Sequence, residues 1–313
     1  EVRESSGVVP TPPYIVNDIL ERTLIPALSG KTPDELQNFT LADICCGSGV
    51  FLLGAYDVLL NYHLDWYIKQ NEGHFQDKIY EVGKGQWRLK FEEKRDILLC
   101  TIRGVDIDPN AVEVAKFSLL LKLIEDETSE SLRAYADATK KIVLPKLDNI
   151  IRFGNSLIEH KALPPSKNGD DLIDKIIPFT WKDEFPEEMK ADGFDVIVGN
   201  PPYIRIQNMV NYSPEEVALY RDKSSPYVTA KIGNFDKYTL FIERSLDLIS
   251  PVGGVGLIVP NKFMTTAAGE AVRELMTQNQ LLKEIVHFGA QQVFGRNTSN
   301  YTCTLILNKL KND

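Results

Sequence analysis

The residues Asn200-Pro201-Pro202-Tyr203 are the part of the sequence whose types and order most directly suggest chemistry. They follow a nearly apolar stretch, 194–199, which predicts a buried strand that ends just before Asn200. The prolines restrict the loop and leave carbonyl acceptors without competing backbone donors. The Asn200 side-chain oxygen and the Pro201 carbonyl could both accept from one amino group, while Tyr203 stacks on the planar system that carries it. Two such acceptors would make the nitrogen of an aromatic or amide amine more tetrahedral, and so a better nucleophile.

A glycine-containing loop follows the first predicted strand, 41–44, at a position typical of ligand sites. The loop contains Gly47, Ser48 and Gly49, and an apolar pattern of helical period continues from it. In a doubly wound sheet, ligands bind beyond the carboxyl ends of the strands, where glycines let the backbone approach closely. A plain tight turn would have a similar sequence, so this loop alone does not identify a ligand.

An acidic residue, Asp106, stands near the end of the second predicted strand, 102–107. Its carboxylate could accept hydrogen bonds from both hydroxyls of a ribose, and Ile107 could pack on an adenine ring. Asp106 follows Gly49 by 57 residues, against roughly 20 in a dinucleotide-binding unit. The loop also lacks the Lys-Ser/Thr pair of a P-loop. Both observations favour a nucleoside cofactor that carries no phosphate.

The strands and helices that must position these residues alternate along the chain. The pattern predicts strands at 41–44, 102–107, 149–153, 194–199, 255–259, 282–288 and 301–308, and helices at 50–62, 111–124, 241–249 and 268–279. A turn at 251–254 is expected to introduce the strand at 255–259. The alternation predicts an α/β fold with a mainly parallel, doubly wound sheet. The stretches 63–100, 125–148 and 158–193 interrupt it and are interpreted as insertions in one domain.

Composition narrows the possible partners. The net charge is −9, which argues against a chain that coats nucleic acid, yet residues 200–313 hold 12 Lys and Arg against 10 Asp and Glu. A polyanion is therefore expected to meet the C-terminal part. The four cysteines form no CxxC pair and the four histidines form no cluster, so no metal site is predicted. No apolar run reaches the roughly 18 residues that span a bilayer, and a cytoplasmic protein is expected.

Taken together, these motifs resemble the gamma class of DNA adenine methyltransferases. Within that class the chain is similar to the methyltransferase portion of single-chain type II restriction–modification enzymes, of the type IIG/IIS kind. The resemblance covers most of the chain and includes the order of the motifs. It implies a Rossmann-like S-adenosylmethionine-dependent methyltransferase fold with an antiparallel strand near the C-terminus. It further implies methyl transfer to the N6 amine of an adenine flipped out of double-stranded DNA, with S-adenosylhomocysteine as the product.

The resemblance also assigns roles to individual residues. Asn200, Pro201, Pro202 and Tyr203 would form the catalytic motif. The residues implied for cofactor binding are Thr11, Pro12, Asp43, Cys45, Gly47, Ser48, Gly49, Phe51, Asp106, Ile107, Asn155, Ser156, Leu157 and Asn200. Tyr203 and Phe294 would hold the two faces of the target base, in a pocket that also contains Lys262 and is lined by segments 236–243 and 253–263.

The sequence departs from the family pattern at the cofactor site. Ile44-Cys45 replaces a commoner Pro-Ala, and Asn155 stands where the family usually has an acid that accepts from the cofactor's adenine amine. An asparagine oxygen can still accept that hydrogen bond. Because the family reads DNA with a separate recognition domain, residues 1–313 are expected to be the catalytic domain alone. The recognition domain, and possibly a nuclease domain, would lie elsewhere in the same polypeptide.

Two alternatives remain open on the sequence alone. The motif at 200–203 also suits methylation of a protein glutamine amide, or of an RNA amine, by an enzyme of the same fold. The segments 236–243 and 253–263 and the long insertions favour DNA. A non-catalytic domain that binds S-adenosylmethionine as a scaffold is a different class, and the intact motif argues against it.

Overall fold

The computed structural model describes residues 11–164, 169–231, 233–289, 291, 293–294 and 301–311. Within them, seven strands form one sheet in the order β5–β4–β1–β6–β7–β9–β8. The strands are β1 (Leu41–Asp43), β4 (Ile102–Asp106), β5 (Ile151–Phe153), β6 (Phe194–Gly199), β7 (Ile249–Pro260), β8 (Leu282–His287) and β9 (Thr302–Asn308). Strands β5, β4, β1, β6 and β7 pair in parallel, whereas β9 runs antiparallel to both β7 and β8. The predicted fold class, including the antiparallel strand near the C-terminus, is confirmed.

Helices cover both faces of the sheet because its central strands are apolar on both sides. On β6, Val196 and Val198 pack into one hydrophobic core and Ile197 into the other. The first core includes side chains of α2 (Pro13–Leu28), α3 (Val50–Lys69), α4 (Phe91–Thr101) and α5 (Pro109–Leu123). The second includes side chains of α8 (Trp181–Glu184), α10 (Ile206–Met209), α11 (Pro214–Arg221), α12 (Lys237–Leu248) and α13 (Glu270–Gln278).

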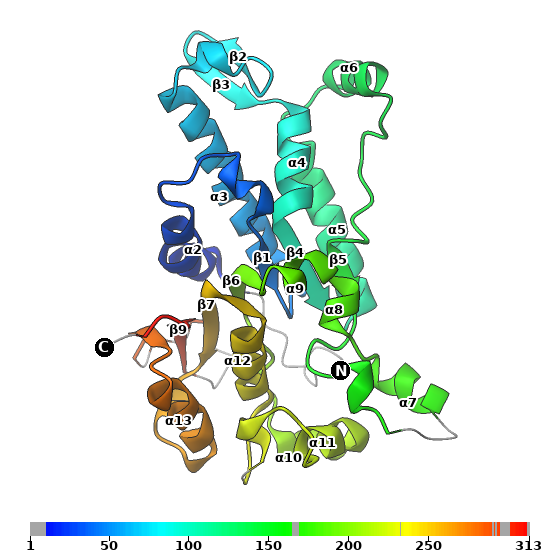
Figure 1. The fold of residues 1–313 in the computed structure, drawn as a ribbon, viewed down its shortest axis with the longest axis vertical. Coiled ribbons are helices and arrows are strands. Elements are labelled where there is room, and N and C mark those ends of the chain that lie inside the picture. The colour runs from blue at the N-terminus through cyan, green and yellow to red at the C-terminus, as the bar shows by residue number, and fades with distance from the viewer. Residues whose placement is uncertain are drawn as a thin grey trace.

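The three expected insertions contain regular structure of their own. The first holds a two-stranded hairpin, β2 (Ile79–Gly83) and β3 (Gln86–Leu89), followed by α4, and the second holds α6 (Ser129–Thr139). The third holds α7 (Gly169–Ile176), α8 and α9 (Pro186–Lys190). Figure 1 shows the hairpin at one end of the molecule and α10, α11 and α13 at the opposite end, with the sheet between them. In the part of the chain described, no helix is both long and apolar enough to cross a bilayer.

Helices α2, α10 and α11 were not predicted, and strand β7 differs from its prediction. In α2, Ile15, Ile19 and Leu20 lie at helical spacing and are buried. Strand β7 begins at Ile249 and runs through the expected turn at 251–254. Gly253 makes this possible, because a Cβ there would lie 2.8 Å from the Phe194 carbonyl oxygen. The glycine lets the strand continue with a shift of register instead of turning.

Candidate active site

The carboxyl ends of four neighbouring parallel strands meet at one edge of the sheet. In sheet order they are the ends of β5, β4, β1 and β6, which carry Phe153, Asp106, Asp43 and Gly199. The strand order reverses at β1, which pairs with β4 on one side and with β6 on the other. Such a reversal opens a crevice at the carboxyl ends of the strands, where doubly wound folds bind their ligands. The predicted motifs after β1, β4 and β6 therefore share one site.

Asp106 holds the loop that follows β1. Its Oδ2 accepts from the backbone N–H of Gly47 at 2.8 Å, and its Oδ1 accepts from that of Asp108 at 2.9 Å. The backbone N–H of Cys46 donates to the Val105 carbonyl at 3.0 Å, which also ties the loop to β4. A carboxylate has about four acceptor positions, so Asp106 can hold this loop and still accept from two hydroxyls of a ligand.

Gly49 directly precedes α3, as its N-cap residue, with a positive φ of 87°. A Cβ there would lie 3.1 Å from the Ala115 Cβ, so α5 packs directly on the loop backbone. Ser48, beside it, is exposed, whereas Phe51 is 3% exposed and packs in the first hydrophobic core. The structure thus brings Gly47 and Ser48 to the crevice edge and places Phe51 behind it.

Asp43 is buried beneath the crevice. It is 1% exposed, and its Oδ1 accepts from the Cys45 N–H at 3.0 Å. Burial raises the pKa of Asp43 to about 7, although the Cys45 hydrogen bond acts in the opposite direction. A Cβ on Gly199 would lie 2.8 Å from the same Oδ1, so Asp43 occupies the space beside the end of β6. Asp43 therefore links the loop after β1 to the start of the motif at 200–203.

The motif at residues 200–203 is fixed by contacts with distant parts of the chain. Asn200 Nδ2 donates to Thr11 Oγ1 at 3.0 Å, which places Thr11 beside the end of β6. Tyr203 Oη donates to the Ile258 carbonyl on β7 at 3.0 Å. Burial raises the pKa of Tyr203 well above its usual value, so the hydroxyl stays protonated. Thr11 was predicted to contact the cofactor; its hydrogen bond to Asn200 was not foreseen.

Tyr203 and Phe294 lie together, as the predicted base pocket requires, but they touch each other. Their ring centroids are 6.2 Å apart with an interplanar angle of 68°, and Tyr238 packs edge-on against Tyr203 at 6.4 Å. A base between two rings needs parallel planes about 7 Å apart, which is twice a van der Waals contact. The rings must therefore turn and separate before a base can enter.

Exposed apolar side chains stand beside Asp106. Ile107 is 44% exposed and Phe153 is 43% exposed, and Phe153 pairs with Asp106 in the β4–β5 register. Sequence reasoning identified Ile107 but missed Phe153, although an aromatic residue at the end of a predicted strand, beside the acid predicted to bind a ribose, could have indicated it. The carboxylate and the two apolar surfaces fit a purine nucleoside.

The turn after β5 is almost fully buried. Asn155, Ser156 and Leu157 are 3%, 4% and 2% exposed. Ser156 Oγ donates to the Ile44 carbonyl, and Trp181 Nε1 donates to the Ser156 carbonyl at 3.0 Å. These bonds attach the turn to the loop after β1 and to α8.

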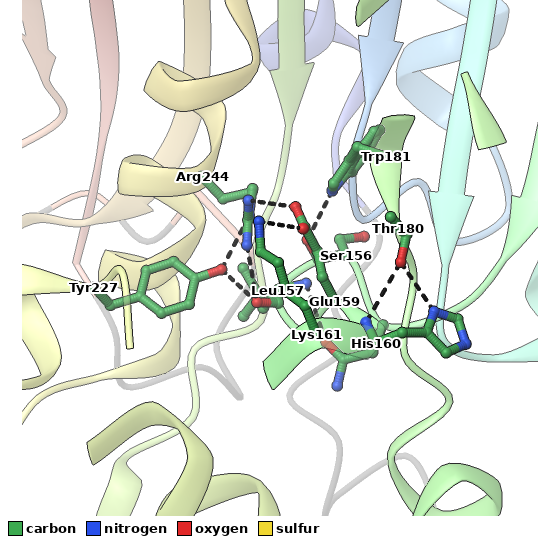
Figure 2. Close-up of polar contacts among 10 residues, drawn as sticks. Ser156, Leu157, Glu159, His160, Lys161, Thr180, Trp181, Tyr227 and Arg244 are labelled. Carbon is green, nitrogen blue, oxygen red and sulfur yellow. Dashed lines mark hydrogen bonds and ion pairs between the residues drawn. The ribbon is translucent and has the colours of Figure 1, made fainter. Parts of the chain in front are cut away.

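Figure 2 shows polar contacts between this turn and the helices and loops that pack against it. The Leu157 carbonyl accepts from Tyr227 Oη at 2.6 Å and from Arg244 Nη2 at 3.1 Å. Arg244 Nη1 also lies 3.4 Å from Glu159 Oε1. Arg244 belongs to α12, which also contains most of the segment 236–243 that was predicted to line the target-base pocket.

Lys262 forms an ion pair with Asp236 across the two segments expected to line the base pocket. Its Nζ lies 2.8 Å from Asp236 Oδ2, and the Lys262 side chain is 29% exposed. Across the ranges that the structure describes, no group of three or more His, Cys, Asp or Glu side chains is arranged to hold a metal ion.

The sheet topology and the arrangement of the β1 loop, the acid on β4 and the motif after β6 define the S-adenosylmethionine-dependent methyltransferase fold. Solved methyltransferase subunits of restriction–modification systems share this fold. The chain belongs to the Eco57I restriction-modification methylase family, whose model matches residues 101–294. The family resemblance that the motifs predicted is confirmed.

Individual relatives agree with this family. The chain is 38% identical over 306 residues to the type II restriction enzyme and methyltransferase RM.Eco57I of Escherichia coli, covering 98% of this chain and 28% of the relative. It is 27% identical over 287 residues to the adenine-specific methyltransferase PglX of Streptomyces coelicolor, covering 87% and 20%. Among solved structures, a nuclease-deletion mutant of the Type ISP restriction–modification enzyme LlaGI with a DNA substrate mimic superposes with a TM-score of 0.58 at 14% identity, covering 97% and 23%. The chain thus spans less than a third of each of these proteins.

Proposed function

We propose that this chain transfers a methyl group from S-adenosylmethionine to the exocyclic N6 amine of an adenine in double-stranded DNA, within a restriction–modification system. The observation that carries the proposal is the position of Asn200 to Tyr203. The motif leaves β6 beside β1, whose loop is held by Asp106 on β4. Family membership and the adenine-specific relative PglX support DNA adenine as the substrate.

The residues around Asp106 fit the proposed cofactor. Asp106 would accept from the ribose hydroxyls, while the exposed side chains of Ile107 and Phe153 would cover the adenine. Gly47 and Ser48 would lie along the cofactor, and Asn155 would accept from its adenine amine. When bound, the cofactor supplies an electrophilic methyl group on a positively charged sulfur.

Asn200 and Pro201 would hold the target amine. The hydrogen bond from Asn200 Nδ2 to Thr11 orients the amide, so that Asn200 Oδ1 serves as an acceptor for the amine together with the Pro201 carbonyl. The two acceptors would localise the nitrogen lone pair and direct it toward the methyl group. The bond from this methyl to sulfur would break as its bond to nitrogen forms, and the extra proton on the nitrogen would pass to water. Positioning of this kind accounts for most of the rate that the site would supply.

Tyr203 and Phe294 would hold the flipped base once their rings separate. Each stack of a base on an aromatic ring contributes about 1–3 kcal/mol, which offsets an unstacking cost of a few kcal/mol. Lys262, fixed by Asp236, would stand at this pocket and meet the negatively charged DNA.

We further propose that the 313 residues form one catalytic domain, and that reading of the DNA sequence belongs to other parts of the polypeptide. The small share of each long relative that the chain covers supports this division.

The test is to identify the methylated product. The chain would be incubated with isotopically labelled S-adenosylmethionine and unmethylated genomic DNA, and the DNA then digested to nucleosides for mass spectrometry. The proposal predicts labelled N6-methyldeoxyadenosine. Label in methylcytosine, or label in a glutamine-containing peptide or in RNA but not in DNA under matched conditions, would overturn it.

A further inference from the structure

A buried polar cluster joins the turn after β5 to helices α11 and α12. Glu216 on α11 is 6% exposed. Its Oε1 accepts from Asn155 Nδ2 at 3.3 Å, from Lys237 Nζ at 2.7 Å and from Tyr220 Oη. Its Oε2 accepts from Ser213 Oγ at 3.1 Å. Burial by itself raises the pKa of Glu216, but the charge of Lys237 and the hydrogen bonds from its partners outweigh burial and lower it, so the carboxylate is ionised.

The cluster determines the orientation of the Asn155 amide. Asn155 Oδ1 accepts from the Leu157 N–H at 3.1 Å, while Asn155 Nδ2 faces Glu216. A carboxylate only accepts and a backbone N–H only donates, so one orientation of the amide satisfies both partners. An amide oxygen can accept two hydrogen bonds, so Asn155 Oδ1 can bind Leu157 and a ligand amine together.

The same cluster explains why an asparagine suits this position. An aspartate at 155 would place a second carboxylate about 3 Å from the ionised Glu216, and two such groups in a buried site disfavour each other's charge. Here the negative charge resides on Glu216, which accepts a hydrogen bond from Asn155, the residue that would contact the cofactor.

Lys237 extends the cluster to the catalytic motif. Its side chain binds Glu216, and its backbone N–H donates to the Ile204 carbonyl at 2.8 Å, next to Tyr203. The Ile206 N–H donates to the Phe235 carbonyl at 3.1 Å, which fastens the same loop to the start of α12 a second time. Lys237 is therefore linked to the turn after β5 through Glu216, and to the loop after β6 directly.

We propose that Glu216 is a positioning residue of the cofactor site, which orients the Asn155 oxygen toward the cofactor's adenine amine and, through Lys237, joins that contact to the catalytic loop. The inference rests on the proposed function, because it assumes that the adenine of S-adenosylmethionine lies at the end of β5. It adds that recognition of the adenine amine depends on a residue of α11 that does not touch the cofactor.

The test compares two ligands by isothermal titration calorimetry. S-Adenosylhomocysteine carries the adenine amine, and S-inosylhomocysteine carries a carbonyl oxygen in its place. The wild-type chain should prefer the first by about 10- to 100-fold, because the second sets a carbonyl against the Asn155 oxygen. The double variant Glu216→Met/Lys237→Met removes the ion pair as a unit, which often leaves folding intact. The Asn155 amide then keeps the Leu157 N–H but loses the acceptor of its Nδ2. It is held less firmly, so the preference should fall to within about threefold.

A matched control is available on the same helix. Lys175 Nζ lies 3.1 Å from Glu215 Oε1 at the surface, and Glu215→Met/Lys175→Met should keep the wild-type preference. The exchanged variant Asn155→Asp/Glu216→Gln keeps a single negative charge in the cluster and an acceptor at 155, so it should also keep the preference. It provides a second test should the double methionine variant fail to fold.

The outcomes separate this inference from the proposed function. If the wild-type chain binds neither ligand, the proposed cofactor is wrong and the inference falls with it. If the wild type prefers the adenosyl ligand and the Glu216/Lys237 variant keeps that preference, Glu216 does not position Asn155. Loss of the preference in the exchanged variant would overturn the inference as well.

Discussion

The buried carboxyl of Asp43 leads to a specific prediction about stability and pH. Asp43 lies under the cofactor loop, 1% exposed, with the Cys45 N–H as its hydrogen-bond donor. Because burial penalises the charged form, its pKa in the folded chain rises from 3.8 to about 7. Replacement by asparagine keeps the shape and an acceptor for Cys45 but removes the titration.

The size and sign of the effect follow from this shift. Between about pH 4 and about pH 7 the folded chain keeps the Asp43 proton while the unfolded chain has lost it. The Asp43 contribution to the free energy of unfolding therefore falls as the pH rises through this window and is constant above it. At 1.36 kcal/mol for each pKa unit, the full change is about 4 kcal/mol, and about 3 kcal/mol of it falls between pH 5 and pH 8.

The assay is urea unfolding of the wild-type chain and Asp43→Asn at several pH values from 5 to 8. The variant should gain about 3 kcal/mol relative to the wild type over that range. Asp222→Asn is a control, because hydrogen bonds from the Ser224 side chain and backbone lower the pKa of that exposed carboxyl from 3.8. Both its folded and its unfolded pKa then lie below the assay range, so the difference in stability between that variant and the wild type should stay constant from pH 5 to pH 8. A difference between Asp43→Asn and the wild type that does not change with pH would refute the argument.

Three further substitutions test the site. Asp106→Ala should weaken S-adenosylhomocysteine binding about 10- to 100-fold in calorimetry, because hydrogen bonds to a charged group contribute about 1.5–3 kcal/mol; unchanged binding would remove Asp106 from the cofactor site. Gly49→Ala should lower the free energy of unfolding, measured in urea, by about 1–3 kcal/mol. The reasons are the φ of +87° and the position of the new Cβ, 3.1 Å from the Ala115 Cβ. Wild-type stability of this variant would contradict the packing. Tyr203→Phe, which loses only the hydrogen bond to Ile258, should keep most DNA methylation, whereas Tyr203→Ala should raise the KM for DNA about tenfold through loss of a base stack; equal KM values would argue against stacking.

Much of the fold could be predicted because the signals were local. Strand β6 is apolar on both faces, and Asn200 follows it directly, so the position of the catalytic motif at a strand end needed no knowledge of other segments. The same holds for Gly47, which follows the short strand β1, and for Asp106, which ends the short strand β4. These two strands pair in parallel. Phe51 was assigned to the cofactor site from its place in the family motif, although its spacing in the sequence also indicated a core position. It shares a helical face with Leu52, Ala55 and other buried residues of α3, and that spacing indicated the core.

The contacts between distant segments could not be predicted. The hydrogen bond between Asn200 and Thr11 joins residues 189 positions apart, and Glu216 meets Asn155 across 61 positions. Nothing in the local pattern of α11 distinguishes Glu216 from its neighbour Glu215, yet one is buried in a cluster and the other binds Lys175 at the surface. Which carboxylate is buried depends on how α11 packs against the rest of the fold, and this packing cannot be predicted from a single sequence.

The most direct test of the central claim is single-turnover methyl transfer by Asn200→Ala, beside S-adenosylhomocysteine binding in the same preparation. The account predicts wild-type binding and a transfer rate to adenine in DNA that is lower by about 100-fold or more. Asn208→Ala, at an exposed asparagine on α10, should leave both unchanged. Transfer at the wild-type rate by Asn200→Ala would contradict the account, because the amine would then be activated without the residue that is proposed to hold it.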